Sequence, residues 1–159
     1  MYYDDLKTGN YGRETVKKYL ESLDITSYVK DVSDDENLNN YGIDLIWIKM
    51  DKKTAETVMV RTDRKADNTK NFIYEEVENK KKKTPGKFRR MKVSEILYFC
   101  SGNRALYEIS PSKLDKYVHS EDSGLELKNM GDHGQGYILK IDDLVDKKIA
   151  KVIGYVGMI

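Results

Sequence analysis

Asp44 and Arg61 have the residue types and spacing that best suit chemistry on a phosphate. Asp44 lies in an apolar run over 41–47, and Arg61 lies in a second strand-like run over 58–63. Carboxylates on adjacent strands can share a Mg²⁺ ion, which polarises a phosphate ester and generates hydroxide. A cation two residues after the second carboxylate points the same way and steadies developing charge. Met59 occupies that second acid position, and a thioether is a poor ligand for Mg²⁺.

Other acids are candidates to complete such a site. Glu75 and Glu76 lie in the next strand-like run, over 71–77, and either one is a candidate for a migrated metal ligand beside Asp44. Arg61 can hold a phosphate but cannot act as a base, because its guanidinium stays protonated. The alternative is a buried ion pair between Asp44 and Arg61 where a metal would otherwise bind. The catalytic candidates are therefore Asp44, Arg61 and Glu75, and the metal candidates are Asp44 and Glu75.

A basic segment follows over 79–92. It contains eight cations and no acid, namely Lys80, Lys81, Lys82, Lys83, Lys87, Arg89, Arg90 and Lys92. Pro85-Gly86 marks a turn inside it. We interpret the segment as a loop that contacts phosphates, and the alternative is a solvated loop. The nucleic-acid-binding candidates are Lys81, Lys82, Lys83, Lys87, Arg89 and Arg90.

Hydrophobic periodicity predicts the elements that position these residues. Strands are expected over 27–33, 43–50, 56–63, 71–77, 105–109 and 137–141. Helices are expected over 12–24, 93–99, 111–119 with Ser110 as N-cap, and 142–152 with Asp142 as cap. Loops and turns are expected over 34–41, 51–55 and 64–70.

The order of these elements predicts the fold class. The short link between the runs over 43–50 and 56–63 indicates an antiparallel hairpin, which the run over 71–77 is expected to extend as a meander. Strands and helices then alternate. We predict an α/β or α+β fold, with a central mixed sheet flanked by helices, in a single domain over 1–159.

Composition bounds the class of protein. Lys and Arg number 28 against 27 Asp and Glu, a formal net charge of +1, so nucleic-acid binding must rest on a local patch. The single cysteine, Cys100, excludes an intrachain disulfide and is expected to be a packed thiol. His119 and His133 lack a recognisable pairing and are expected at the surface. No run reaches the ~18–20 apolar residues of a membrane span, and no signal-peptide core follows the N-terminus, so we expect a cytoplasmic protein without a membrane partner.

The sequence resembles the PD-(D/E)XK, or restriction-endonuclease-like, nuclease superfamily, in particular its small phage and prophage members. The resemblance covers roughly 12–141 and rests on these pieces: Gly12-Arg13-Glu14 at the first helix, Asp44 as the first metal-binding aspartate, the run over 58–63 as the acid-x-Lys strand, the strand over 71–75 that ends in Glu75, the Thr84-Pro85-Gly86 turn, and Tyr107-Glu108-Ile109 before a helix. The departures are Met59 for the acid, Arg61 for the lysine, and Lys87-Phe88 where the family usually has Trp.

The resemblance implies a restriction-endonuclease-like fold and three functional hypotheses. The first is a phage or mobile-element protein that binds DNA or RNA with lost or reduced cleavage and needs no cofactor. The second is an active Mg²⁺-dependent endonuclease with a migrated acid. The third is a protein-binding anti-defence inhibitor of the anti-CRISPR type, whose partner is a host defence complex. All three place the protein in the host cytoplasm, and a homodimer stays open because many relatives dimerise.

Overall fold

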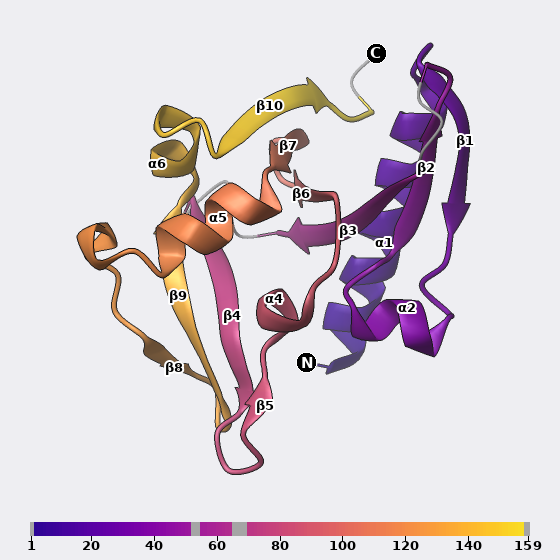
Figure 1. Ribbon diagram of the computed structural model, residues 1–159. Helices are drawn as coiled ribbons and strands as arrows, with labels where there is room; N and C mark the ends of the chain where they lie inside the picture. Colours follow the sequence, from indigo (N-terminus) through magenta and orange to yellow (C-terminus); the bar gives the residue numbers. More distant parts are fainter. Residues whose placement is uncertain (1, 52–54, 65–69, 158–159) are drawn as a thin grey trace.

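Two sheets form the frame of the structure (Figure 1). The computed structural model describes residues 2–51, 55–64 and 70–157, with side chains from residue 7 onward. Six strands form a mixed sheet, in the order β1 (Thr26–Asp31), β2 (Leu45–Lys49), β3 (Glu56–Asp63), β6 (Glu95–Cys100), β7 (Ala105–Ile109) and β10 (Ala150–Tyr155). β3 and β6 are parallel, and the other neighbours are antiparallel.

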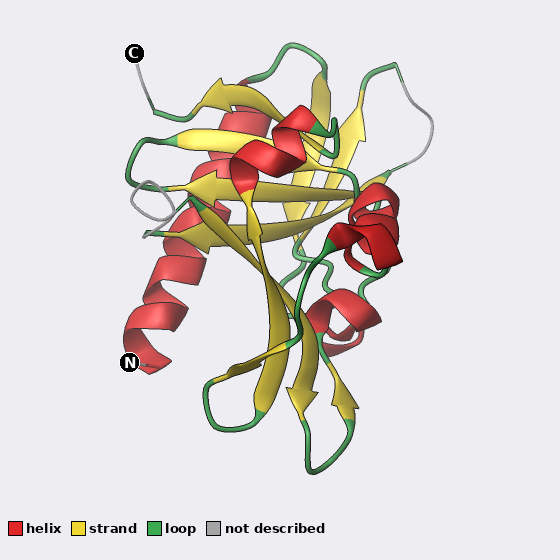
Figure 2. Cartoon of the chain, turned by 90° about the vertical axis from the view of Figure 1, so that its left-hand side faces the viewer, coloured by secondary structure: helices red, strands yellow, loops and turns green. Residues whose placement is uncertain are grey.

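The second sheet is antiparallel and has four strands. Their order is β5 (Thr84–Pro85), β4 (Asn71–Asn79), β9 (Gly134–Lys140) and β8 (Lys128–Met130). We call this sheet the arm, because it extends away from the rest of the structure, with the turn between β4 and β5 at its far end (Figures 1 and 2). The sequence patterns did not predict a second sheet.

Helices cover both faces of the six-stranded sheet. In the described part of the chain they are α1 (Tyr2–Ser22), α2 (Glu36–Asn40), α4 (Lys87–Arg90), α5 (Pro111–Val118) and α6 (Ile141–Asp146), with one 3₁₀ turn, η1 (Glu121–Ser123). The predicted α+β arrangement, a mixed sheet flanked by helices, is confirmed. None of the described helices is long and apolar enough to cross a membrane.

Each face of the six-stranded sheet has its own hydrophobic core. On one face, Val16 and Leu20 of α1 pack with Val58 and Leu97 of the sheet. The helix predicted over 12–24 is therefore confirmed, although α1 begins at Tyr2. The second core, on the opposite face, joins the sheet to the arm and to three helices; it includes Ile96, Tyr98, Phe72, Tyr74, Phe88, Leu114 and Leu144.

The helix predicted over 93–99 is wrong, because this segment forms β6. Ile96 and Tyr98 enter one core, and Leu97 and Phe99 enter the other. A strand buried on both faces reads as a continuous apolar run, and periodicity alone does not separate such a run from a buried helix. Cys100 at the end of β6 is buried, as the sequence predicted.

The predicted meander is wrong at its third strand. β2 and β3 form the expected antiparallel hairpin, but β4 pairs with β5 and β9 in the arm. The second neighbour of β3 is β6, which follows β4 and α4 in the chain. The segment over 70–90 is therefore a crossing connection between two parallel strands, as a parallel pair requires.

Two further predictions need correction. The loop expected over 34–41 contains α2, which Asp35 caps by accepting a hydrogen bond from the Leu38 amide. The helix expected over 142–152 ends early, because Lys148 adopts φ 59° and the chain then pairs with β7 as β10. Asp142 lies in the first turn of α6 and is not its cap.

Several expectations are confirmed. The strands over 56–63 and 105–109 match β3 and β7, and α5 starts at Pro111 with Ser110 as N-cap. The strands predicted over 27–33, 43–50 and 137–141 correspond to β1, β2 and β9, within a few residues at each end. The predicted turns over 51–55 and 64–70 fall largely on 52–54 and 65–69, outside the described residues.

Candidate functional site

A cleft of about 570 Å³ lies where the carboxyl end of β3 meets α1 and α4. Its lining residues are Thr8, Gly9, Arg13, Asn39, Asp44, Val60, Arg61, Thr62, Asp63, Arg64 and Lys87. They include four cations and two carboxylates. Two of the predicted catalytic residues, Asp44 and Arg61, therefore share one cleft.

Asp44 stands at the buried end of the cleft. Its backbone amide donates to the Val58 carbonyl at 2.8 Å, and its Oδ2 accepts from the Val60 amide at 2.8 Å. These two contacts fix the carboxylate against β3. The residue is only 7% exposed, and this burial raises the pKa of Asp44 despite the opposing charge of Lys87 and the bond from Val60.

Arg61 and Met59 project from the same face of β3 but have different surroundings. Met59 is fully buried in the core on that face, where the arm and α4 pack, and it does not line the cleft. Arg61 lines the cleft and lies over the Phe88 ring, 5.7 Å from its centroid. The predicted ion pair between Asp44 and Arg61 is wrong, since no pair within 4 Å joins these two described residues.

Lys87 lines the same cleft as Asp44, and the charges of the two side chains interact. Lys87 is the first residue of α4, and its backbone amide donates to Glu75 Oε1 at 2.9 Å. Burial lowers the pKa of Lys87 despite the opposing charge of Asp44, and the nearby Arg61 lowers it further. The sequence predicts Lys87 only on a basic loop, because its place in the same cleft as Asp44 depends on the crossing connection.

Close backbone packing brings α1 and α4 to the cleft. A Cβ on Gly12 would lie 1.6 Å from Thr62 Oγ1, and a Cβ on Gly86 would lie 2.3 Å from the Glu75 carbonyl oxygen. A larger side chain at either position would therefore push its helix away. Gly12 holds the neighbouring Arg13 at the cleft, where the Arg13 Nε–Asp31 Oδ2 distance is 2.9 Å.

Of the two predicted metal ligands, Asp44 lines the cleft and Glu75 does not. Glu75 lies on β4, in the arm rather than on a strand next to β3, and its Oε1 accepts the Lys87 amide. Glu76 contacts Arg89 and His119. No group of three or more His, Cys, Asp or Glu side chains within the described ranges is placed to hold a metal ion.

The six predicted nucleic-acid-binding residues of the basic segment divide into three groups. Lys87 enters the cleft. Arg89 and Arg90 belong to α4 and have acidic partners: Glu76 and Asp115 for Arg89, and Glu78 for Arg90. Lys81, Lys82 and Lys83 are exposed in the turn between β4 and β5.

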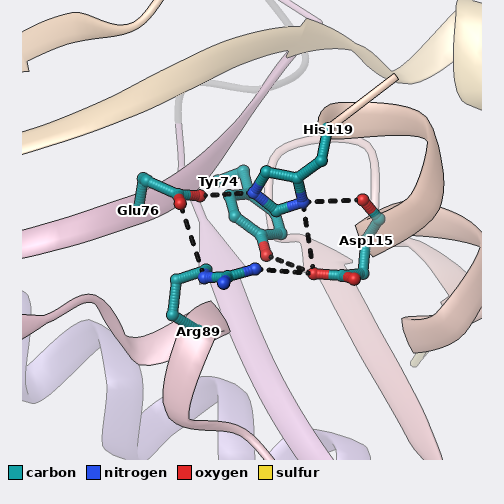
Figure 3. A network of polar contacts seen from close by, with 5 residues as sticks. All are labelled: Tyr74, Glu76, Arg89, Asp115 and His119. Carbon is teal, nitrogen blue, oxygen red and sulfur yellow. Dashed lines mark hydrogen bonds and ion pairs between the residues drawn. The ribbon is translucent and has the colours of Figure 1, made fainter. Parts of the chain in front are cut away.

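A network around His119 fastens α4 to the arm and to α5 (Figure 3). His119 Nε2 lies 2.8 Å from Glu76 Oε2, and His119 Nδ1 lies 2.8 Å from the Asp115 carbonyl oxygen. Arg89 lies between the same two acids, 3.4 Å from Glu76 Oε1 and 3.3 Å from Asp115 Oδ1. Tyr74 donates its hydroxyl to Asp115 Oδ1 at 3.1 Å.

The partners of His119 favour its charged form. Both ring nitrogens face oxygens that only accept hydrogen bonds, so both nitrogens donate when the ring is protonated. Partial burial lowers the pKa of His119, but the bonds to Glu76 and Asp115 together outweigh it and raise the pKa above its usual value. Nothing in the sequence predicts this role, because the partners lie 43 and four residues away with no recognisable motif.

No protein-family model, curated protein or solved structure matches this chain.

Proposed function

We propose that this chain binds nucleic acid in the cleft, as a phage or mobile-element protein on a restriction-endonuclease-like fold whose cleavage is lost or reduced. The order of elements supports that fold: one helix, three antiparallel strands, a crossing connection, and a strand parallel to the third. This order of elements fits the resemblance seen in the sequence. Asp44 directly precedes β2, and Arg61 lies on β3.

The observation that carries the proposal is the excess of cations in the cleft. Arg61, Arg64 and Lys87 make no ion pair within 4 Å with any described residue, so their charges are available to a ligand. Cations that contact phosphates release condensed counterions and so drive nucleic-acid binding. The partly buried position of Lys87 strengthens such a contact, because charges interact more strongly away from water.

The surroundings of Met59 support reduced cleavage. A second metal-binding acid belongs at this position in the resemblance, and here the side chain is a thioether buried in the core. Glu75, the candidate for a migrated acid, is engaged by the Lys87 amide. Asp44 is left with Asp63 as the other carboxylate that lines the cleft.

The test is a pair of assays on one preparation. Fluorescence polarisation measures binding of single- and double-stranded DNA and RNA, and a gel measures cleavage with Mg²⁺ or Mn²⁺. We expect binding that weakens steeply with salt and no cleavage. Cleavage would favour an active endonuclease, and absence of binding at low salt would favour a protein partner.

Asp44→Asn separates a binding cleft from an active site. Asparagine keeps an oxygen that accepts the hydrogen bond from the Val60 amide. The substitution removes a negative charge that would repel bound phosphates. We expect the variant to bind at least about fivefold more tightly than the wild type, since one repulsive charge is removed. If the wild type cleaves nucleic acid and this variant does not, the protein is an enzyme and the proposed loss of cleavage is wrong.

A further inference from the structure

The turn at the end of the arm is ordered and strongly basic. Lys80, Lys81, Lys82 and Lys83 follow one another, and all four are exposed. Asn79 Oδ1 accepts from the Lys82 amide at 3.1 Å, and the Lys80 amide donates to the His133 carbonyl at 2.9 Å. These bonds give the turn a defined shape and fasten it to the neighbouring turn between β8 and β9.

The turn costs the free protein stability. Lys83 adopts φ 54°, the left-handed region that side chains with a Cβ disfavour. Lys81, Lys82 and Lys83 make no ion pair with any residue in the described ranges, so their mutual repulsion is not offset. Like charges held together at one exposed place suit an anionic ligand, which would offset their mutual repulsion.

The surroundings of the turn favour a duplex over a single strand. Binding of single strands relies on aromatic side chains on which bases stack. The exposed tyrosines of the described chain are Tyr11, Tyr28, Tyr41 and Tyr155, and none of them lies on the arm. The turn therefore offers contacts to phosphates but no exposed Phe, Tyr or Trp ring for stacking.

The spacing between the turn and the cleft suits one duplex. The Lys87 amide donates a hydrogen bond to the Glu75 side chain, so Glu75 marks the point along β4 that is nearest to the cleft residue Lys87. From Glu75 to the turn, four to six residues of extended chain span roughly 15–20 Å at about 3.4 Å per residue. That length corresponds to about five base-pair steps of B-form DNA, at about 3.4 Å per step along one strand.

We propose that the turn over 80–83 contacts the phosphate backbone of a DNA duplex that also occupies the cleft. The proposal rests on the proposed function of the cleft. The step length of B-form DNA, which matches the span from the cleft to the turn, is the reason for assigning DNA as the duplex.

The test compares two triple variants that each remove three exposed lysines. The first is Lys81→Gln with Lys82→Gln and Lys83→Gln, on the arm. The matched control is Lys18→Gln with Lys30→Gln and Lys151→Gln, on α1, β1 and β10, away from the cleft and the arm. Fluorescence polarisation with a labelled 20-base-pair DNA duplex gives the affinity at several salt concentrations, and thermal unfolding verifies that both variants are folded.

We expect the arm variant to weaken DNA binding at least about tenfold and to lower the slope of log affinity against log salt by roughly 2–3, as three lost phosphate contacts require. The control leaves both nearly unchanged. A triple Lys→Arg variant at 81–83 retains wild-type affinity, because it keeps the charges.

Each of the other possible results of these assays contradicts one part of the proposal. If the wild type binds DNA and the arm variant behaves like the control, the arm contact is wrong and the cleft proposal stands. If no nucleic acid binds the wild type, both fail. If a single strand, an RNA duplex or polyglutamate of equal charge shows the same dependence on Lys81, Lys82 and Lys83, the assignment to a DNA duplex is wrong.

Discussion

Lys87 and Asp44 have opposite charges and line the same cleft, yet burial disfavours the charged form of each. The ordinary route to a stable buried pair is a close, fully hydrogen-bonded contact. Here Asp44 takes its hydrogen bond from the Val60 amide instead, which leaves the Lys87 ammonium available to a phosphate. A bound phosphate would favour the protonated form of Lys87, because an opposite charge nearby stabilises the charged state.

Position 59 corresponds to the second metal-binding acid in the resemblance to the nuclease superfamily. The surroundings of Met59 determine whether an acid at this position could bind a metal. The side chain is fully buried, and its Cε lies close enough to Gly42 that a Cβ there would approach to 2.4 Å. We expect Met59→Glu to lower the free energy of unfolding by about 3 kcal/mol or more, because it buries a carboxylate without a partner. Urea unfolding measures this loss.

Met59→Leu is the matched control, since it changes shape but not polarity. It is expected to cost less than about 1.5 kcal/mol. If Met59→Glu retained wild-type stability and Mg²⁺ raised its unfolding midpoint, the side chain at this position would reach the cleft. The assignment of Met59 to the core alone would then be wrong.

At the scale of elements, α4 connects the cleft to the rest of the structure. This four-residue helix presents Lys87 to the cleft at one end and Arg89 to the His119 network. An isolated helix of this length is not stable, so its position depends on its contacts. The network, the packing of Phe88 and the close approach of Gly86 to β4 supply them.

The network predicts a pH-dependent contribution to stability. The pKa of folded His119 is raised above its unfolded value of about 6.5, so the contribution is fully present below about pH 6.5 and is lost as pH rises through the folded pKa. We expect His119→Gln to lower the free energy of unfolding by roughly 1 kcal/mol at pH 5.5, since a charged hydrogen bond on a partly exposed side chain is lost. The loss shrinks toward pH 8.5, and urea unfolding across this range measures it.

His133→Gln is the control for this experiment. His133 is exposed on the turn between β8 and β9, and its side chain is not part of the network. Its substitution is expected to have the same small effect at every pH. A constant difference between wild type and His119→Gln from pH 5.5 to 8.5 would show that the imidazole adds no proton-linked stability.

Local signals in the sequence predicted some elements well. The hairpin of β2 and β3 follows from two apolar runs and a short link, and α5 follows from Ser110 before Pro111. Pairing between distant segments was not predictable in the same way. β4 has the alternation of an ordinary strand, and nothing in that pattern states that its partner is β9, more than 50 residues later, rather than β3.

The candidate site was predictable to a similar degree. Asp44 directly precedes β2 and Arg61 lies on β3, the two strands of a local hairpin, so their shared cleft followed from the spacing. Lys87 reaches the cleft through the arm and α4, and His119 meets Glu76 across two elements. Such contacts depend on tertiary packing, and a single sequence does not encode them in a local pattern.

At the scale of the whole molecule, the formal net charge of +1 conceals an uneven distribution. Cations without acidic partners gather in the cleft and at the end of the arm. Some of the other cations are paired, as in the contacts of Lys49 with Glu56 and Glu95. A nearly neutral chain can thus present local basic surfaces, and local charge rather than net charge governs nucleic-acid affinity.

The cleft is proposed to bind the phosphates of nucleic acid, and the salt dependence of DNA binding by Lys87→Gln tests this proposal. The control is Lys116→Gln, which removes an exposed lysine from α5 outside the cleft. With a DNA duplex, we expect Lys87→Gln to weaken binding about tenfold and to lower the slope of log affinity against log salt by about 0.9, while the control binds like the wild type. Equal affinities and slopes for the two variants would contradict the proposal.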